Sequence, residues 1–258
     1  MLGHVVRLAT QATGRNTPDS EGVRDPRSGL ILQRGSCRPL GATPLADGVN
    51  FAVFSRHASA VQLLLFQEGK DDPLAELSLD PVQNRTGDIW HLFVKDLRPG
   101  ILYGYRMNGP FAPRQGDRFN SRTILLDPYA RAISGTYPWG VRRDNARRPS
   151  HLARVHHDDF DWGDDAPPGV PLAETILYEL HVRGYTRHPS SGVQHPGTYL
   201  GLIEKIPYLS SLGVTSVQLM PVLECDESDV PGRHPGTGAP LVNYWGYSPL
   251  GVFALKGA

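Results

Sequence analysis

Four carboxylic acids lie close together late in the chain, and pairs of carboxyl groups can hydrolyse glycosidic bonds. They are Glu224, Asp226, Glu227 and Asp229. Glycoside hydrolysis needs one carboxyl group as the acid and another as the nucleophile or base, on either side of the scissile bond. Four acids within six residues of one loop are more often a solvated loop than such a pair. We therefore expect no catalytic residue in this group.

An aromatic cluster follows these acids at residues 243–247. It contains Tyr244, Trp245 and Tyr247, together with an asparagine and a glycine. Sugars present flat C–H faces that stack on aromatic rings, while their hydroxyls seek polar neighbours, and this mixture suits both needs. The three aromatic residues are our candidate substrate-binding residues. An aromatic core or a protein interface is the alternative interpretation, and the sequence leaves it open.

A polar run at residues 156–165 contains His156, His157 and five aspartates. Histidine and aspartate can bind metals, but ligands rarely come from one undivided run, so we favour a solvated linker packed by Phe160 and Trp162. The sequence contains no Walker loop, GxSxG elbow, HExxH or GxGxxG motif. We expect neither a metal nor a cofactor.

The bulk composition narrows the class of protein. The 258 residues carry no net charge, and 20% of them are charged, which argues against nucleic acid or an anionic membrane as the partner. The apolar runs have the length of strands, and the N-terminus lacks a signal-peptide core. Two isolated cysteines, Cys37 and Cys225, are typical of free thiols in a reducing compartment. We expect a cytoplasmic protein.

Two different patterns of elements would position the candidate residues. Residues 1–35 lack periodicity and read as a poorly ordered extension. Residues 36–135 show short strands with period-two alternation, spaced by roughly ten residues, which predicts an immunoglobulin-like β-sandwich without the Cys-Trp-Cys pattern of antibody domains. The strands are expected at 49–53, 61–65, 74–79, 90–94 and 103–107.

The pattern changes after a proline-rich linker at 136–171. A strand at 175–182, a helix from Thr198 to about Leu212, and a strand at 214–222 predict a βαβ unit with parallel strands. Pro207 should kink or shorten the helix, and Gly213 should end it. Residues 172–258 are thus expected to form about two βα units of an incomplete TIM (β/α)₈ barrel. The carboxyl ends of its strands would carry the site.

Taken together, these segments resemble bacterial glycogen debranching enzymes and isoamylases of the α-amylase superfamily. The resemblance runs in order over about residues 36–256. It is carried by residues 39–43, 48–55, 103–106, 109–111, 118–120, 127–130, 160–163, 176–184, 197–199, 219–222 and 243–247.

The resemblance implies a retaining hydrolase that cleaves α-1,6 branch linkages in an α-glucan such as glycogen or maltodextrin. It implies that Tyr247 matches the tyrosine that stacks on the sugar next to the scissile bond. The family's Asp nucleophile and Glu acid/base come from later strands, so we expect this chain to be inactive alone. The alternatives are a non-catalytic glucan-binding module and a fragment of a branching transferase or trehalohydrolase. The sequence does not indicate an oligomeric state.

Overall fold

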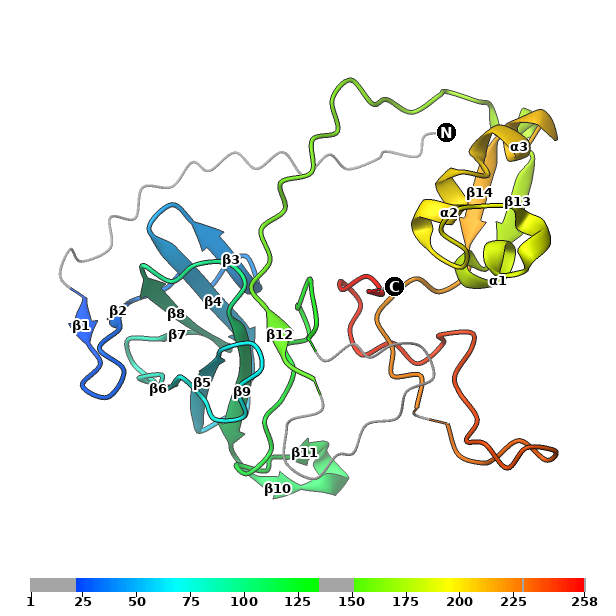
Figure 1. Cartoon of the computed structure of the whole chain (residues 1–258). Coiled ribbons are helices and arrows are strands. Elements are labelled where there is room, and N and C mark those ends of the chain that lie inside the picture. Colours follow the sequence, from blue (N-terminus) through cyan, green and yellow to red (C-terminus); the bar gives the residue numbers. More distant parts are fainter. Residues whose placement is uncertain (1–21, 135–150, 229, 258) are drawn as a thin grey trace.

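The computed structural model describes residues 22–134, 151–228 and 230–257. Figure 1 shows a β-sandwich formed by the first half of the chain and a small α/β unit formed by the second half. An extended stretch after residue 155 connects the two. The fold therefore has the two-part organisation that the sequence predicts.

Two antiparallel sheets form the sandwich. The first sheet has the strand order β1-β2-β8-β4-β3. A sixth, short strand, β7 (Arg85–Thr86), also pairs with β8. The second has the order β12-β9-β5-β6. The first sheet contains β1 (Val23–Arg24), β2 (Ile31–Gln33), β8 (Ile89–Lys95), β4 (Gly48–Phe54) and β3 (Gly41–Leu45). The second contains β12 (Ala153–Arg154), β9 (Leu102–Asn108), β5 (Ala60–Phe66) and β6 (Ala75–Ser78).

The sandwich core comes from the alternating residues of these strands. Trp90 is fully buried at its centre, and the indole nitrogen donates to the carbonyl oxygen of Ser55 at 3.1 Å. Leu64 and Phe66 lie on the other face of β5, where they pack in a second, smaller cluster that includes Leu152. The predicted sandwich is confirmed, and the second cluster explains why β5 is apolar on both faces. The remaining core residues of the central strands are Val49, Phe51, Val53, Val61, Leu63, Leu65, Leu92 and Val94.

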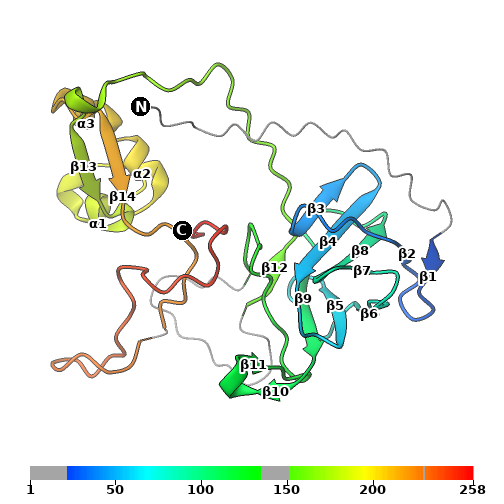
Figure 2. The same ribbon diagram turned by 180° about the vertical axis from the view of Figure 1, so that it is seen from behind.

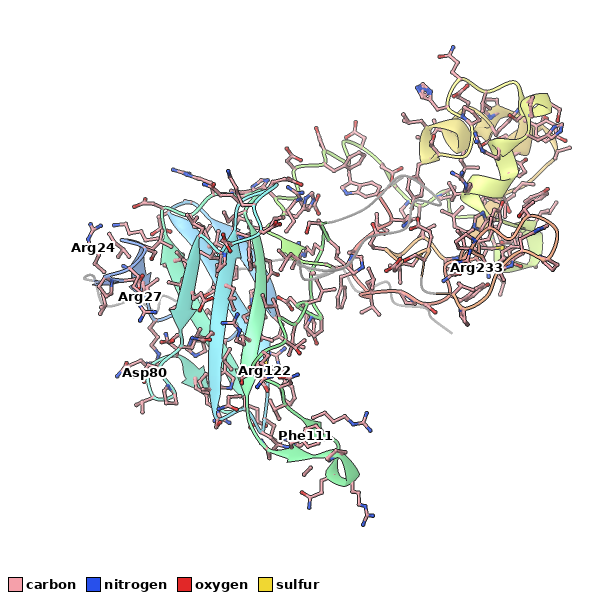
Figure 3. The ribbon with its side chains drawn as sticks, turned by 60° about the horizontal axis from the view of Figure 1, so that its bottom comes forward. Arg24, Arg27, Asp80, Phe111, Arg122 and Arg233 are labelled. Carbon is pink, nitrogen blue, oxygen red and sulfur yellow. The ribbon has the colours of Figure 1, made fainter. Side chains whose placement is uncertain are left out.

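A hairpin of β10 (Phe111–Ala112) and β11 (Asp117–Arg118) projects from one end of the sandwich, with the 3₁₀ turn η1 (Pro113–Gln115) at its tip. Figure 3 shows Phe111 on this projection, where its side chain is largely exposed. At one edge of the second sheet, β12 pairs with β9, and Ala153 and the following Val155 are buried. The sandwich thus extends to residue 155, inside the range expected as linker. At its other end it includes β1 and β2, so the expectation of a poorly ordered extension is wrong for residues 22–35. A two-residue strand is too short to show periodicity in the sequence.

The α/β unit contains one parallel strand pair. Its β13 (Leu177–Leu180) pairs with β14 (Ser216–Leu219), as the strand–helix–strand pattern predicts. Between them lie α1 (Val182–Arg187), η3 (Pro189–Ser191), α2 (Tyr199–Ile203) and α3 (Ile206–Ser211), and η2 (Leu172–Glu174) precedes β13. No helix of the described residues is long and apolar enough to cross a membrane.

Two local departures from the predicted elements have clear causes. The expected helix is divided into α2 and α3, because proline is tolerated only at the start of a helix. Pro207 lies in the first turn of α3, where a backbone N–H would have no partner within the helix. Thr198 caps α2, and Gly213 ends α3 with a positive φ of 80°, both as predicted. The strand expected to reach residue 182 ends at Leu180. His181 is the N-cap of α1, and its ring accepts a hydrogen bond from the Gly184 backbone N–H.

His91 leads to a prediction about the pH dependence of stability. The side chain is 1% exposed in β8 and its Nε2 lies 2.8 Å from the Thr86 hydroxyl. Burial, followed by the charge of Arg34, holds the pKa of His91 below its usual value. Below pH of about 6.5 the unfolded chain therefore binds more protons than the folded chain. The free energy of unfolding should fall as the pH falls through this window.

Urea unfolding at pH 7 and pH 5 checks this expectation. His91→Gln should reduce the difference in midpoint between the two pH values, even if it lowers stability at both. The matched control is His157→Gln, since the His157 side chain is exposed in the segment after the sandwich. A wild-type midpoint that is the same at both pH values would contradict the expectation.

Candidate functional site

A pocket of about 120 Å³ lies at the carboxyl ends of β13 and β14. His181 follows the last residue of β13, and Pro221 and Val222 follow β14 closely. Tyr244 and Trp245 complete one wall of the pocket. Residues that follow neighbouring parallel strands meet at one edge of the sheet, which is where barrel enzymes place their sites.

His181 organises the aromatic wall. Its ring stacks on Tyr244, with centroids 4.7 Å apart and planes at 19°. Trp245 contacts both rings edge-on, at 5.6 Å from His181 and 5.4 Å from Tyr244. The sequence did not single out His181, because its partners lie more than sixty residues later in the chain.

Two hydrogen bonds determine the state of the His181 ring. Nδ1 accepts from the Gly184 backbone N–H at 3.0 Å, and Nε2 donates to the Tyr244 carbonyl oxygen, also at 3.0 Å. Because Nδ1 is an acceptor, the ring is neutral with its proton on Nε2. Burial lowers the pKa of His181, against the opposing effect of the hydrogen bond to Tyr244. The aromatic wall is therefore held in one orientation near neutral pH.

Tyr247 is separate from this wall. Tyr244 and Trp245 line the pocket and are 38% and 52% exposed, whereas Tyr247 is 65% exposed and is not part of the lining. Gly246, with φ of 75°, turns the backbone between them and packs against Pro221 and Cys225. The Asn243 side-chain oxygen accepts from the Gly246 N–H at 3.0 Å. The structure thus brings together two of the three candidate residues.

The acidic loop is a structural clamp. Glu224 is only 3% exposed, and its Oε1 lies 2.7 Å from Lys256 Nζ. Lys256 also pairs with Glu227 at 2.6 Å and donates to the Cys225 carbonyl oxygen at 3.0 Å. The expectation of a solvated loop is therefore wrong for Glu224. Its partner is thirty-two residues away in the sequence, so the local composition could not reveal the pair.

Asp226 also has partners nearby. It accepts hydrogen bonds from the Ser228 backbone N–H and hydroxyl at 2.9 and 2.6 Å, and its other oxygen lies 3.6 Å from His151 Nε2. Burial acts to raise the pKa of Asp226, but the Ser228 hydrogen bonds and His151 together lower it. Asp229 lies outside the described residues. The three described acids therefore hold the loop in place.

The segment that lines the pocket is anchored in the sandwich. Residues 249–256 run between the sandwich and the α/β unit, shown in red in Figure 2. Ala254 is fully buried in the sandwich core, and the Phe253 ring stacks on Tyr129 with centroids 5.2 Å apart. Single bridges join Leu223 to Leu255 and Cys225 to Pro249. Residues 249–256 thus tie the pocket to the sandwich.

The polar run at 156–165 is a solvent-exposed segment. Its side chains are exposed, and Phe160 and Trp162 contact one another edge-on at 4.8 Å. Within the ranges that the structure describes, no three His, Cys, Asp or Glu side chains gather as potential metal ligands.

Comparison with known proteins accounts for both parts of the chain. Residues 39–130 match carbohydrate-binding module 48, the isoamylase N-terminal domain. Chloroplastic isoamylase 3 of Oryza sativa subsp. japonica is 42% identical over 253 residues, which cover 93% of this chain and 32% of that protein. Chloroplastic isoamylase 1 of Arabidopsis thaliana is 38% identical over 231 residues, which cover 87% of this chain and 30% of that protein. At 93% coverage, the alignment with isoamylase 3 includes residues of both the sandwich and the α/β unit.

This chain is homologous to the N-terminal region of isoamylase-type debranching enzymes. It spans about a third of the length of these isoamylases.

Solved structures of two pullulanases resemble most of this chain. The pullulanase from Bacillus acidopullulyticus aligns with a TM-score of 0.64 and 25% identity, covering 91% of this chain and 26% of that one. The pullulanase from Paenibacillus barengoltzii in complex with maltohexaose and α-cyclodextrin aligns with a TM-score of 0.61 and 25% identity. The alignment covers 86% of this chain and 33% of that one. The α/β unit therefore corresponds to the start of an α-amylase-type catalytic domain, as the fold prediction states.

Proposed function

We propose that this isoamylase-type chain forms the N-terminal part of a debranching hydrolase that cleaves α-1,6 linkages in glycogen or related α-glucans. The observation that carries the proposal is the pocket walled by Tyr244 and Trp245 at the carboxyl ends of two parallel strands. Barrel enzymes build their sites at this edge. The carbohydrate-binding module in the same chain supports a glucan partner.

In this proposal, the residues of the chain bind and orient the sugar. Tyr244 and Trp245 supply ring faces and edges for the C–H surface of a glucose unit, and the neutral His181 ring holds them in place. Glu224 and Glu227 form ion pairs with Lys256 and do not act as the acid and nucleophile. Those carboxyl groups would come from other strands of a complete barrel. A cytoplasmic location is part of the proposal.

Binding of maltohexaose to the 258-residue chain tests the proposal. Trp245→Ala should weaken binding by about threefold to tenfold, because one aromatic stacking contact is worth about 0.5–1.5 kcal/mol. Isothermal titration calorimetry measures the affinity. Trp162→Ala is the matched control, since Trp162 is exposed outside the pocket. The same preparation should release no reducing ends from glycogen, and release above a buffer blank would contradict our assignment of the acidic loop.

A glucan-binding module in which the sandwich acts alone is the second candidate, favoured by the family match of residues 39–130. The two candidates differ in where the glucan binds. If both Trp245→Ala and Tyr244→Ala leave maltohexaose binding unchanged, the result would support glucan binding by the sandwich and contradict binding in the Tyr244–Trp245 pocket.

A further inference from the structure

A second hollow lies where the sandwich meets the C-terminal segment, apart from the Tyr244–Trp245 pocket. Its volume is about 480 Å³, within the range of pockets that bind small molecules. It is lined by Arg38, Pro39, Leu40, Tyr129, Arg131 and Phe253. The first five belong to the sandwich, and Phe253 belongs to the segment tied into the sandwich core.

One wall of this hollow is a pair of aromatic rings. Tyr129 and Phe253 stack with planes at 17°, and both rings keep part of their surface exposed. The Tyr129 backbone is held in place, because its N–H donates to Asp127 Oδ1 at 2.8 Å. Asp127 is fully buried and accepts a second hydrogen bond from the Tyr103 hydroxyl, also at 2.8 Å. The ring wall is therefore built on a rigid support and does not have to be ordered by a ligand.

The charge of the hollow is positive and uncompensated. Arg38 and Arg131 line it, no lining residue is acidic, and neither guanidinium makes an ion pair within the described ranges. Three other arginines of the sandwich are paired with carboxylates, namely Arg56 with Asp88, Arg106 with Glu76 and Arg154 with Glu68, whereas Arg98 and Arg122, like Arg38 and Arg131, make no ion pair in the described part of the chain. The acidic residue nearest to Arg131 in the sequence, Asp127, is fully buried in the core. Arg38 and Arg131 are therefore available to an anion.

We propose that this hollow binds a pyranose that carries a phosphate ester. Two guanidinium groups can balance the charge of a phosphate, with which arginine makes strong, often bidentate hydrogen bonds. The aromatic wall suits the C–H face of the attached sugar ring. Both arginines are exposed, and a phosphate ester, unlike a neutral glucan, would pair with their charges. The ligand is either a free hexose phosphate or a phosphorylated glucose unit of a glucan.

The site includes Phe253, so its occupation should stabilise the attachment of the C-terminal segment to the sandwich. The site is independent of the proposed debranching function, because it shares no lining residue with the Tyr244–Trp245 pocket. Trp245→Ala should therefore leave phosphate-ester binding unchanged, whatever it does to maltohexaose binding.

Calorimetric titration of the 258-residue chain with glucose 6-phosphate, glucose and inorganic phosphate tests the proposal. Glucose 6-phosphate should bind more tightly than either of the other two, and its affinity should fall as salt is added. Arg38→Gln and Arg131→Gln should each weaken it about fivefold. Arg56→Gln is the control, since that arginine is exposed and already paired with Asp88. Phe253→Leu, which keeps an apolar side chain without the ring, should also weaken binding.

A second arm compares a phosphorylated maltodextrin with the same preparation after phosphatase treatment. Tight binding of the phosphorylated form alone, lost in Arg38→Gln, would support the proposal and identify the glucan as the source. Inorganic phosphate that binds as tightly as glucose 6-phosphate would overturn the pyranose part. The proposal is overturned altogether if neither phosphate ester binds better than its unphosphorylated counterpart, or if the arginine variants bind like Arg56→Gln.

Discussion

Replacing Lys256 by methionine is expected to destabilise the clamp between the acidic loop and the C-terminal segment by about 3 kcal/mol. The reason is that Glu224, almost fully buried, would lose the cation that compensates its charge. Burial alone would lower the pKa of Lys256, but Glu224 and Glu227 raise it, so the ammonium group stays charged. A missing partner in such a pair costs more than the pair contributes, because a lone charge is left in a dry site.

The reactivity of Cys225 measures this effect directly. Its thiol is buried, and its carbonyl oxygen accepts a hydrogen bond from Lys256. In a Cys37→Ser background, a thiol reagent should label Cys225 at least tenfold faster in Lys256→Met than in the parent. Lys70→Met is the control, since that lysine is exposed on the sandwich. Adding Glu224→Gln to Lys256→Met should restore part of the protection. Equal labelling rates in all variants would show that the clamp does not hold the segment.

Replacing Tyr247 by alanine is expected to lower kcat/KM on a branched glucan at least tenfold, in a polypeptide that joins these residues to a complete catalytic domain. By resemblance to debranching enzymes, Tyr247 matches the tyrosine under the sugar next to the scissile bond. In this structure it is 65% exposed, so its ring is accessible to a ligand. A stacking contact is worth about 1 kcal/mol and should contribute more when the ring positions a flattened, positively charged sugar in the transition state.

Tyr247→Phe is the matched control, because it keeps the ring face and removes only the hydroxyl. It should lose much less activity than Tyr247→Ala. Kinetics on a branched glucan, together with thermal unfolding to verify the fold, provide the measurement. If both variants keep full activity, Tyr247 does not contact the sugar, and the binding surface is limited to Tyr244 and Trp245.

The strands of the sandwich and the parallel pair β13–β14 could be predicted from the sequence. In β4 and β8 nearly every residue is buried, but alternate residues face the core between the two sheets, and that period of two is visible in the sequence. The βαβ unit was predictable because parallel strands need a crossover connection, usually a helix, and the sequence shows helical residues between the two strands. Thr198 and Gly213 marked helix ends through local backbone chemistry alone. All of these signals depend on neighbours within a few residues.

The contacts that build the candidate site were decided by the tertiary structure. His181 lies 63 residues before Tyr244, and Glu224 lies 32 residues before Lys256. Composition made the acidic loop look solvated, whereas the fold buries Glu224 by bringing an ammonium group to it. The pattern of aromatic residues indicated one sugar-binding cluster. The structure shows that the turn at Gly246 directs Tyr247 away from the pocket that Tyr244 and Trp245 line. Sequence periodicity reports which face of an element is buried, whereas pairing between distant side chains depends on how the folded elements meet.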